Sequence, residues 1–133
     1  MDRLFLDANI LVAAAWKADA RLGDLWGLPD ARLLGSPHVI EEARRNTHPG
    51  ESAERLERLI GALTVLPSEP ADFPITNDPG LPAKDRPVLL AAIAARADYL
   101  ITGDLAHFGP LFGRSFDGVT VMLPGEYLRS RAR

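Results

Sequence analysis

The 133-residue chain contains no cysteine, and this absence excludes several classes of protein. Disulfide-stapled secreted modules, thiolate zinc sites and enzymes with a thiol nucleophile all require cysteine. The sequence also lacks a P-loop and a glycine-rich dinucleotide-binding motif. Chemistry at this protein's site must therefore come from carboxylate, hydroxyl, amide, imidazole or cationic side chains.

Long apolar runs are missing as well. The uncharged segments 8–16 and 87–95 are far shorter than the roughly 20 residues that span a bilayer. The N-terminal residues Met1–Leu4 lead into a strand pattern rather than a signal-peptide layout. We therefore expect a cytoplasmic protein without membrane contact.

Positive charge is in slight deficit, with 15 bases, 18 acids and a net charge of −3. This balance argues weakly against a nucleic-acid partner, unless several acids gather in one pocket with a metal. The composition, 47% hydrophobic and 25% charged, is typical of a soluble globular protein. The chain length predicts a single domain over residues 1–133.

Short apolar runs alternate with helical patterns along the chain. Proline and glycine separate the elements, and residues 67–82, with five prolines, are expected to form a loop. Strands are predicted at 3–6, 31–34, 63–66, 99–102 and 119–123, and helices at 8–16, 20–27, 37–46, 51–62, 85–97 and 124–131. This alternation predicts an α/β fold, a three-layer α/β/α sandwich with a central parallel sheet of four or five strands.

Two aspartates follow predicted strands. Asp7 comes directly after Leu4–Leu6, and Asp104 follows the strand Tyr99–Thr102 after one glycine. In parallel sheets, ligands bind beyond the carboxyl ends of the strands, so neighbouring strands would bring both acids to one rim. Each aspartate could instead serve as the N-cap of the next helix.

Two further acids lie on predicted helices. Helix periodicity places Glu42 at the margin of the buried face that contains Val39, Ile40 and Ala43, whereas Glu41 points to water. Asp85 stands at a helix start, where it could face the same rim or only complement the helix dipole. A solvated position is the alternative for Glu42.

Four converging carboxylates would repel one another without a cation. Ligation by oxygen atoms alone suits Mg²⁺ or Mn²⁺, and such sites activate water and hold a phosphodiester oxygen in metal-dependent nucleases. With these four acids set aside, 14 acids face 15 bases, so the rest of the chain is nearly neutral.

Four segments of the chain form a recognisable set: Leu6–Val12, Ser36–Ala43, Lys84–Leu89 and Asp98–Gly109. Together they resemble the PIN-domain ribonucleases, and more narrowly the VapC-type toxins of toxin–antitoxin pairs. The order and spacing of the four segments hold across roughly residues 3–129.

The resemblance implies a PIN-like fold and metal-dependent cleavage of RNA. By resemblance, Asp7, Glu42, Asp85 and Asp104 form an acidic quartet that holds one or two Mg²⁺ or Mn²⁺ ions, and Asn9 and Thr102 orient the acids. It also implies a homodimer and a small antitoxin protein that blocks the pocket.

Other residues have two interpretations. Arg86 and His107, next to members of the quartet, are candidates for contacts with RNA phosphates, although solvated positions are the simpler interpretation. We expect His107 to contact phosphate or cap a helix rather than bind metal. Trp16, Leu22, Leu25 and Trp26 could line a groove for an antitoxin helix, or pack in the core or a dimer interface.

Two other functions remain open at this point. One is a PIN-fold module that binds RNA or a partner without catalysis. The other is a phosphatase that uses Asp7 as its nucleophile, although that chemistry usually requires a second acid two residues later, where this chain has Asn9.

Overall fold

The computed structural model describes residues 1–131, and its centre is a sheet whose strands are mostly parallel. Within those residues six strands form one sheet in the order β3-β2-β1-β4-β6-β5. The strands are β1 (Asp2–Leu6), β2 (Ala31–Gly35), β3 (Thr64–Val65), β4 (Tyr99–Ile101), β5 (Ser115–Phe116) and β6 (Val119–Met122). The predicted α/β fold with a central parallel sheet is confirmed.

Helices connect the strands. They are α1 (Ala8–Ala15), the 3₁₀ helix η1 (Arg21–Gly27), α2 (Pro37–Arg45), α3 (Glu51–Gly61), α4 (Arg86–Ala94), α5 (Leu105–Phe108), the 3₁₀ helix η2 (Gly109–Leu111) and α6 (Pro124–Arg131). Helix α2 begins as its sequence predicts, because the Ser36 hydroxyl accepts from the Val39 N–H and Pro37 occupies the first turn.

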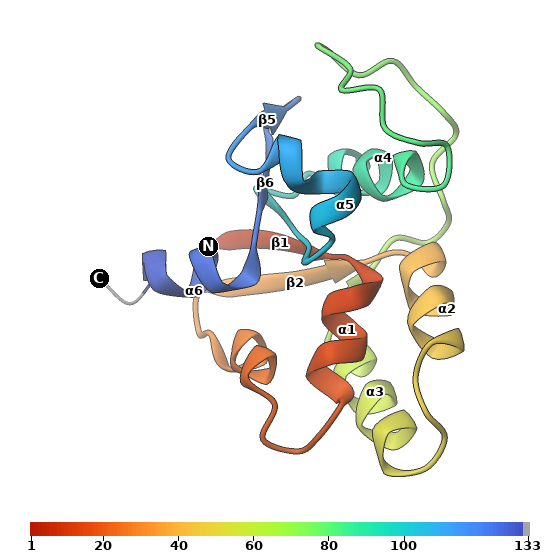
Figure 1. Ribbon diagram of the computed structural model, residues 1–133, viewed down its shortest axis with the longest axis vertical. Helices are drawn as coiled ribbons and strands as arrows, with labels where there is room; N and C mark the ends of the chain where they lie inside the picture. The colour runs from red at the N-terminus through yellow and green to blue at the C-terminus, as the bar shows by residue number, and fades with distance from the viewer. Residues whose placement is uncertain (132–133) are drawn as a thin grey trace.

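The core forms around the central strands. Leu4, Phe5 and Leu6 of β1 are fully buried, as expected for a strand with neighbours on both sides and apolar groups on both faces. Helix α1 packs against α2 and α3, and Figure 1 shows α1 and α3 next to each other. None of the helices within residues 1–131 has the length and apolar content needed to span a bilayer.

Strand β5 is an addition to the prediction. The five parallel strands agree with the four or five expected, and β5 pairs with β6 in the antiparallel direction. Asp117 and Gly118 link the two strands, and both have positive φ angles, 48° and 91°. An Asp-Gly pair is the preferred sequence of a two-residue hairpin turn, so the signal for β5 was present in the sequence.

The parallel register brings several helix starts to one edge of the sheet. Strand β1 pairs with β4 through Leu6 and Ile101, so Asp7 and Thr102 both follow directly at the carboxyl ends. Figure 1 shows α1, α2 and α5 beginning at this same end of the sheet. This edge is where the sequence predicted a ligand site.

Candidate active site

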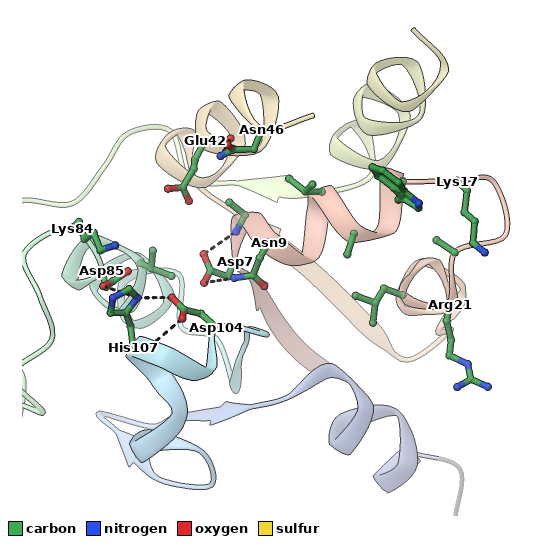
Figure 2. Close-up of a pocket in the computed structure, with 17 residues that line it drawn as sticks. Asp7, Asn9, Lys17, Arg21, Glu42, Asn46, Lys84, Asp85, Asp104 and His107 are labelled. Atoms are coloured by element: carbon green, nitrogen blue, oxygen red, sulfur yellow. Dashed lines mark hydrogen bonds and ion pairs between the residues drawn. The ribbon is translucent and has the colours of Figure 1, made fainter. Parts of the chain in front are cut away.

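A cleft of about 690 Å³ lies at the carboxyl ends of the parallel strands. All four predicted acids line it: Asp7, Glu42, Asp85 and Asp104. They come from four separate elements of the chain, and Figure 2 shows them together on the wall of one pocket. The cleft therefore brings together carboxylates that are up to 97 positions apart, the separation between Asp7 and Asp104.

Asp7 is held firmly at the base of the cleft. Its side chain accepts hydrogen bonds from the Ala8 N–H at 2.8 Å, the Thr102 hydroxyl at 2.8 Å and the Asn9 amide at 3.0 Å. Only 5% of Asp7 is exposed. Burial raises the pKa of Asp7 and the charge of Glu42 raises it further, against the lowering effect of these hydrogen bonds.

Thr102 and Asn9 connect the two strand ends. The fully buried Thr102 hydroxyl accepts from the Asn9 amide at 3.3 Å and from the Asp104 N–H at 3.1 Å. The side-chain amide oxygen of Asn9, Oδ1, in turn accepts from the Gly103 N–H at 2.9 Å. These bonds fix the position of Asp7 relative to Asp104.

Asp104 and His107 form a pair on the first turn of α5. The Asp104 carboxylate accepts from the His107 N–H at 3.1 Å and lies 2.9 Å from Nδ1 of the His107 ring. Burial acts to raise the pKa of Asp104, but the hydrogen bonds and charge of His107 outweigh it, and the pKa is lowered.

The alternative of helix capping applies differently to the three aspartates. Asp7 caps α1 and Asp104 caps α5 through their side chains. Asp85 precedes α4 without making a capping hydrogen bond, and its buried Oδ2 atom has no hydrogen-bond partner within the described part of the chain. A buried oxygen without a partner needs an explanation such as an ion, so capping does not account for Asp85.

Glu42, on α2, lines the same cleft as these aspartates, and Figure 2 shows its carboxylate near Asp7. It is half-buried and lines the cleft, whereas its neighbour Glu41 is exposed and pairs with Arg45 at 3.0 Å. Within residues 1–131, none of the four cleft carboxylates lies within 4.0 Å of a lysine or arginine nitrogen. Within the described residues, the imidazole of His107 is thus the group nearest to a cationic partner that these carboxylates have.

Of the two residues predicted to contact RNA phosphates, His107 and Arg86, the structure places one in the cleft. His107 lines the cleft, but Arg86 lies outside it, where it binds Asp72 at 2.8 Å and Asp78 at 2.6 Å. Lys84 lines the cleft in its stead. It follows a proline-rich segment whose path the sequence pattern did not reveal.

The predicted hydrophobic groove is only partly assembled. Trp16, 61% exposed, and Leu22 line the apolar end of the cleft together with Val12. Leu25 is buried in the core, and the Trp26 indole N–H donates to the Leu59 carbonyl.

Comparison with known proteins identifies the family. A PIN domain family model matches residues 3–106. The chain belongs to the PIN domain family. No curated protein sequence matches the chain as a relative.

The PIN fold is also seen in solved structures. One similar structure is described as the crystal structure of VapBC2 from Rickettsia felis bound to a DNA fragment from their promoter. It is 13% identical in sequence, covers 91% of this chain and 98% of that chain, and has a TM-score of 0.60. The resemblance to the PIN family that the four segments carry is confirmed, and so is the PIN-like fold.

Proposed function

We propose that this PIN domain is a metal-dependent endoribonuclease that hydrolyses RNA phosphodiester bonds, acting as one nuclease domain over residues 1–133. The observation that carries the proposal is the meeting of Asp7, Glu42, Asp85 and Asp104 in one cleft without a lysine or arginine partner in the described chain. Like charges gathered in one cleft are costly unless a cation balances them. The PIN family match supports a nuclease.

The residues of the cleft suit one or two Mg²⁺ or Mn²⁺ ions. The carboxylates of Asp7, Asp85 and Asp104 would hold the ion, and Glu42 would hold a second ion or order a water molecule. Oxygen ligands are those that hard divalent cations prefer, and the unpartnered Oδ2 of Asp85 fits such a ligand. When bound, the ion supplies Lewis acidity at phosphate and a water molecule of lowered pKa.

The chain's own groups perform the positioning. Thr102 and Asn9 fix the Asp7 carboxylate through hydrogen bonds of 2.8 and 3.0 Å, and such supporting partners control the orientation of metal ligands. Lys84, exposed at the rim of the cleft, can attract the RNA backbone. The apolar wall of Val12, Trp16 and Leu22 borders the acids on the other side.

We further propose that the protein is the toxin of a toxin–antitoxin pair and forms a homodimer. The solved structure with the similar fold is described as a VapBC2 complex. An antitoxin segment with apolar side chains would cover Trp16, which is 61% exposed at the end of the cleft. A small open reading frame beside the gene would support this assignment.

A cleavage assay on a defined pool of RNA tests the proposed activity. The parent protein should cut RNA with Mg²⁺ or Mn²⁺ present and stop when the ions are chelated. Asp7→Asn and Asp85→Asn should each lower the rate by more than about a hundredfold, since they remove ligands of an ion that supplies several kcal/mol.

Glu41→Gln is the matched control, because Glu41 is exposed on the same helix as Glu42. It should cut at the parental rate. Binding of RNA without divalent-dependent cleavage would instead indicate a non-catalytic module, and a covalent phosphate on Asp7 would indicate a phosphatase. An Asp85→Asn protein that cuts at the parental rate would refute the assignment.

A further inference from the structure

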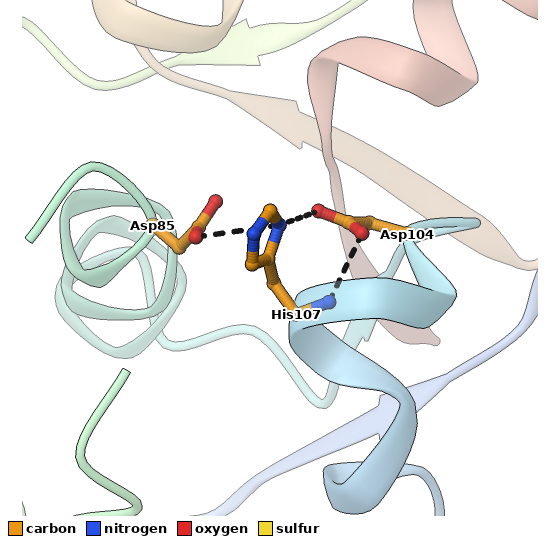
Figure 3. Close-up of side chains that lie close together, drawn as sticks. All are labelled: Asp85, Asp104 and His107. Carbon is orange, nitrogen blue, oxygen red and sulfur yellow. Dashed lines mark hydrogen bonds and ion pairs between the residues drawn. The ribbon is translucent and has the colours of Figure 1, made fainter. Parts of the chain in front are cut away.

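Three side chains that could each offer a ligand atom to a metal ion form a cluster in the cleft. The carboxylate oxygens of Asp85 and Asp104 and a ring nitrogen of His107 all lie within 4.8 Å of one another. Nδ1 of His107 is 2.9 Å from Oδ2 of Asp104 and 3.6 Å from Oδ2 of Asp85. Figure 3 shows the imidazole ring between the two carboxylates, so a single nitrogen faces both acids.

These separations suit ligands of one small divalent ion. Adjacent ligands of an octahedral ion bound at about 2.1 Å are roughly 3 Å apart. The Asp104 oxygen and Nδ1 already lie at about that spacing, and the Asp85 oxygen is slightly further away. That Asp85 oxygen is also the buried atom without a hydrogen-bond partner in the described chain, and ligation of a cation would satisfy it.

The position of the His107 ring is set by the chain around it. His107 stands three residues after Asp104, and its backbone N–H donates to the other Asp104 oxygen at 3.1 Å. Its side chain is 31% exposed. The ring is therefore supported on one side and reachable from solvent on the other. Without an ion, Nδ1 is the donor to Asp104 at 2.9 Å, so ligation would require the tautomer protonated at Nε2, which releases the Nδ1 lone pair.

We propose that His107 contributes Nδ1 as a nitrogen ligand to a divalent cation shared with Asp85 and Asp104. An imidazole ligand shifts the preference of the site from Mg²⁺, which favours oxygen ligands, toward first-row transition ions, of which Mn²⁺ is the weakest binder and so the most stringent probe. The inference rests on the proposed function for a metal in this cleft, and it reverses the expectation from sequence that His107 would not bind metal.

Electron spin-echo envelope modulation of bound Mn²⁺ tests the ligand directly. Full-length protein labelled with ¹⁵N-histidine should show a ¹⁵N coupling, and His107→Gln should abolish it. His48→Gln is the control, because His48 is exposed and does not line the cleft, and it should keep the coupling. A parent protein with bound Mn²⁺ but no ¹⁵N coupling would overturn the proposal.

Calorimetric titration with Mn²⁺ and Mg²⁺ provides the second measurement. His107→Gln should weaken Mn²⁺ binding at least about tenfold and Mg²⁺ binding less. Far-UV circular dichroism confirms that the variant is folded, and His107→Phe repeats the test with a ring that lacks nitrogen. Equal losses for both ions, or tighter binding in either variant, would contradict the proposal.

The two proposals fail separately. Divalent-dependent RNA cleavage without a ¹⁵N coupling would overturn the nitrogen ligand and leave the nuclease intact. A ¹⁵N coupling in a protein that does not cut RNA would support the nitrogen ligand and overturn the proposed nuclease activity.

Discussion

Asp7 is the most deeply buried carboxylate of the cleft, and its environment opposes its charge. Removal from water raises its pKa, and the nearby charge of Glu42 adds to the effect. In the metal-free protein, ionised Asp7 therefore costs stability. A divalent cation bound in the cleft would offset this cost, so the cost supports the proposed metal site.

The pH dependence of stability should reveal this cost. The folded pKa of Asp7 lies above its ordinary value of 3.8, so the folded state binds the proton more tightly. Stability then falls as pH rises from about 3.8 through the raised pKa. Urea unfolding in chelator should show that the stability of Asp7→Asn relative to the parent increases with pH across this interval.

Asp104→Asn should behave in the opposite way. The pKa of Asp104 is lowered, so its contribution to stability is present above 3.8 and is lost as pH falls through the folded value. The stability of the parent relative to Asp104→Asn should thus shrink in acid, as urea unfolding measures.

The two aspartate predictions can each fail. A difference in the free energy of unfolding between the parent and Asp7→Asn that does not change with pH would contradict the account of Asp7.

The sequence predicted part of the site at residue level. Asp7 and Asp104 could be placed at one rim because each follows a strand, and the structure brings both to the cleft. The position of the His107 ring could not be predicted, because it depends on the short helix α5, which has only four residues. Such a helix carries too little periodicity to be recognised.

At the level of structural elements, contacts of Arg86 hold the proline-rich segment 67–82 next to α4. We call Arg86 with its partners Asp72, Asp78 and the Phe73 carbonyl the Arg86 clamp. The Arg86 guanidinium binds the carboxylates of Asp72 and Asp78 and donates to the Phe73 carbonyl at 2.9 Å. Arg86 is also the first residue of α4, directly after Asp85. The clamp therefore holds the segment next to the helix start that presents Asp85.

Removing the clamp should loosen the segment. We expect Asp72→Ala combined with Asp78→Ala to speed amide hydrogen exchange in residues 69–77, because Arg86 loses both carboxylate partners. Mass spectrometry of deuterated peptides measures this directly. Glu57→Gln is the control, since it removes the partner of Arg44 elsewhere, and it should leave exchange in 69–77 unchanged. Equal exchange in the double variant would show that the clamp does not restrain the segment.

Element boundaries were predicted well where local rules apply. Ser36 and Pro37 marked the start of α2, and the buried run Leu4–Leu6 marked β1. The partners of Arg86 could not be predicted, since Asp72 and Asp78 lie in a segment without regular periodicity. Their approach to Arg86 depends on the whole path of that segment, which local pattern does not encode.

At the scale of the whole molecule, charge is divided unevenly. The net charge is −3, yet four acids share one cleft without a lysine or arginine bound to them in the described chain. Several ion pairs outside the cleft, such as Arg44 with Glu57 and Arg45 with Glu41, lie on exposed surface and contribute little. The cleft is therefore where a divalent cation should change the stability of the fold.

Thermal unfolding with and without Mn²⁺ is the most direct test of this central claim. At a concentration a hundred times the dissociation constant, the ion should stabilise the parent by about 2.7 kcal/mol, and Asp85→Asn should respond far less. A parent protein whose unfolding temperature is unaffected by Mn²⁺ or Mg²⁺, or an Asp85→Asn variant that responds equally, would contradict a metal site formed by these carboxylates.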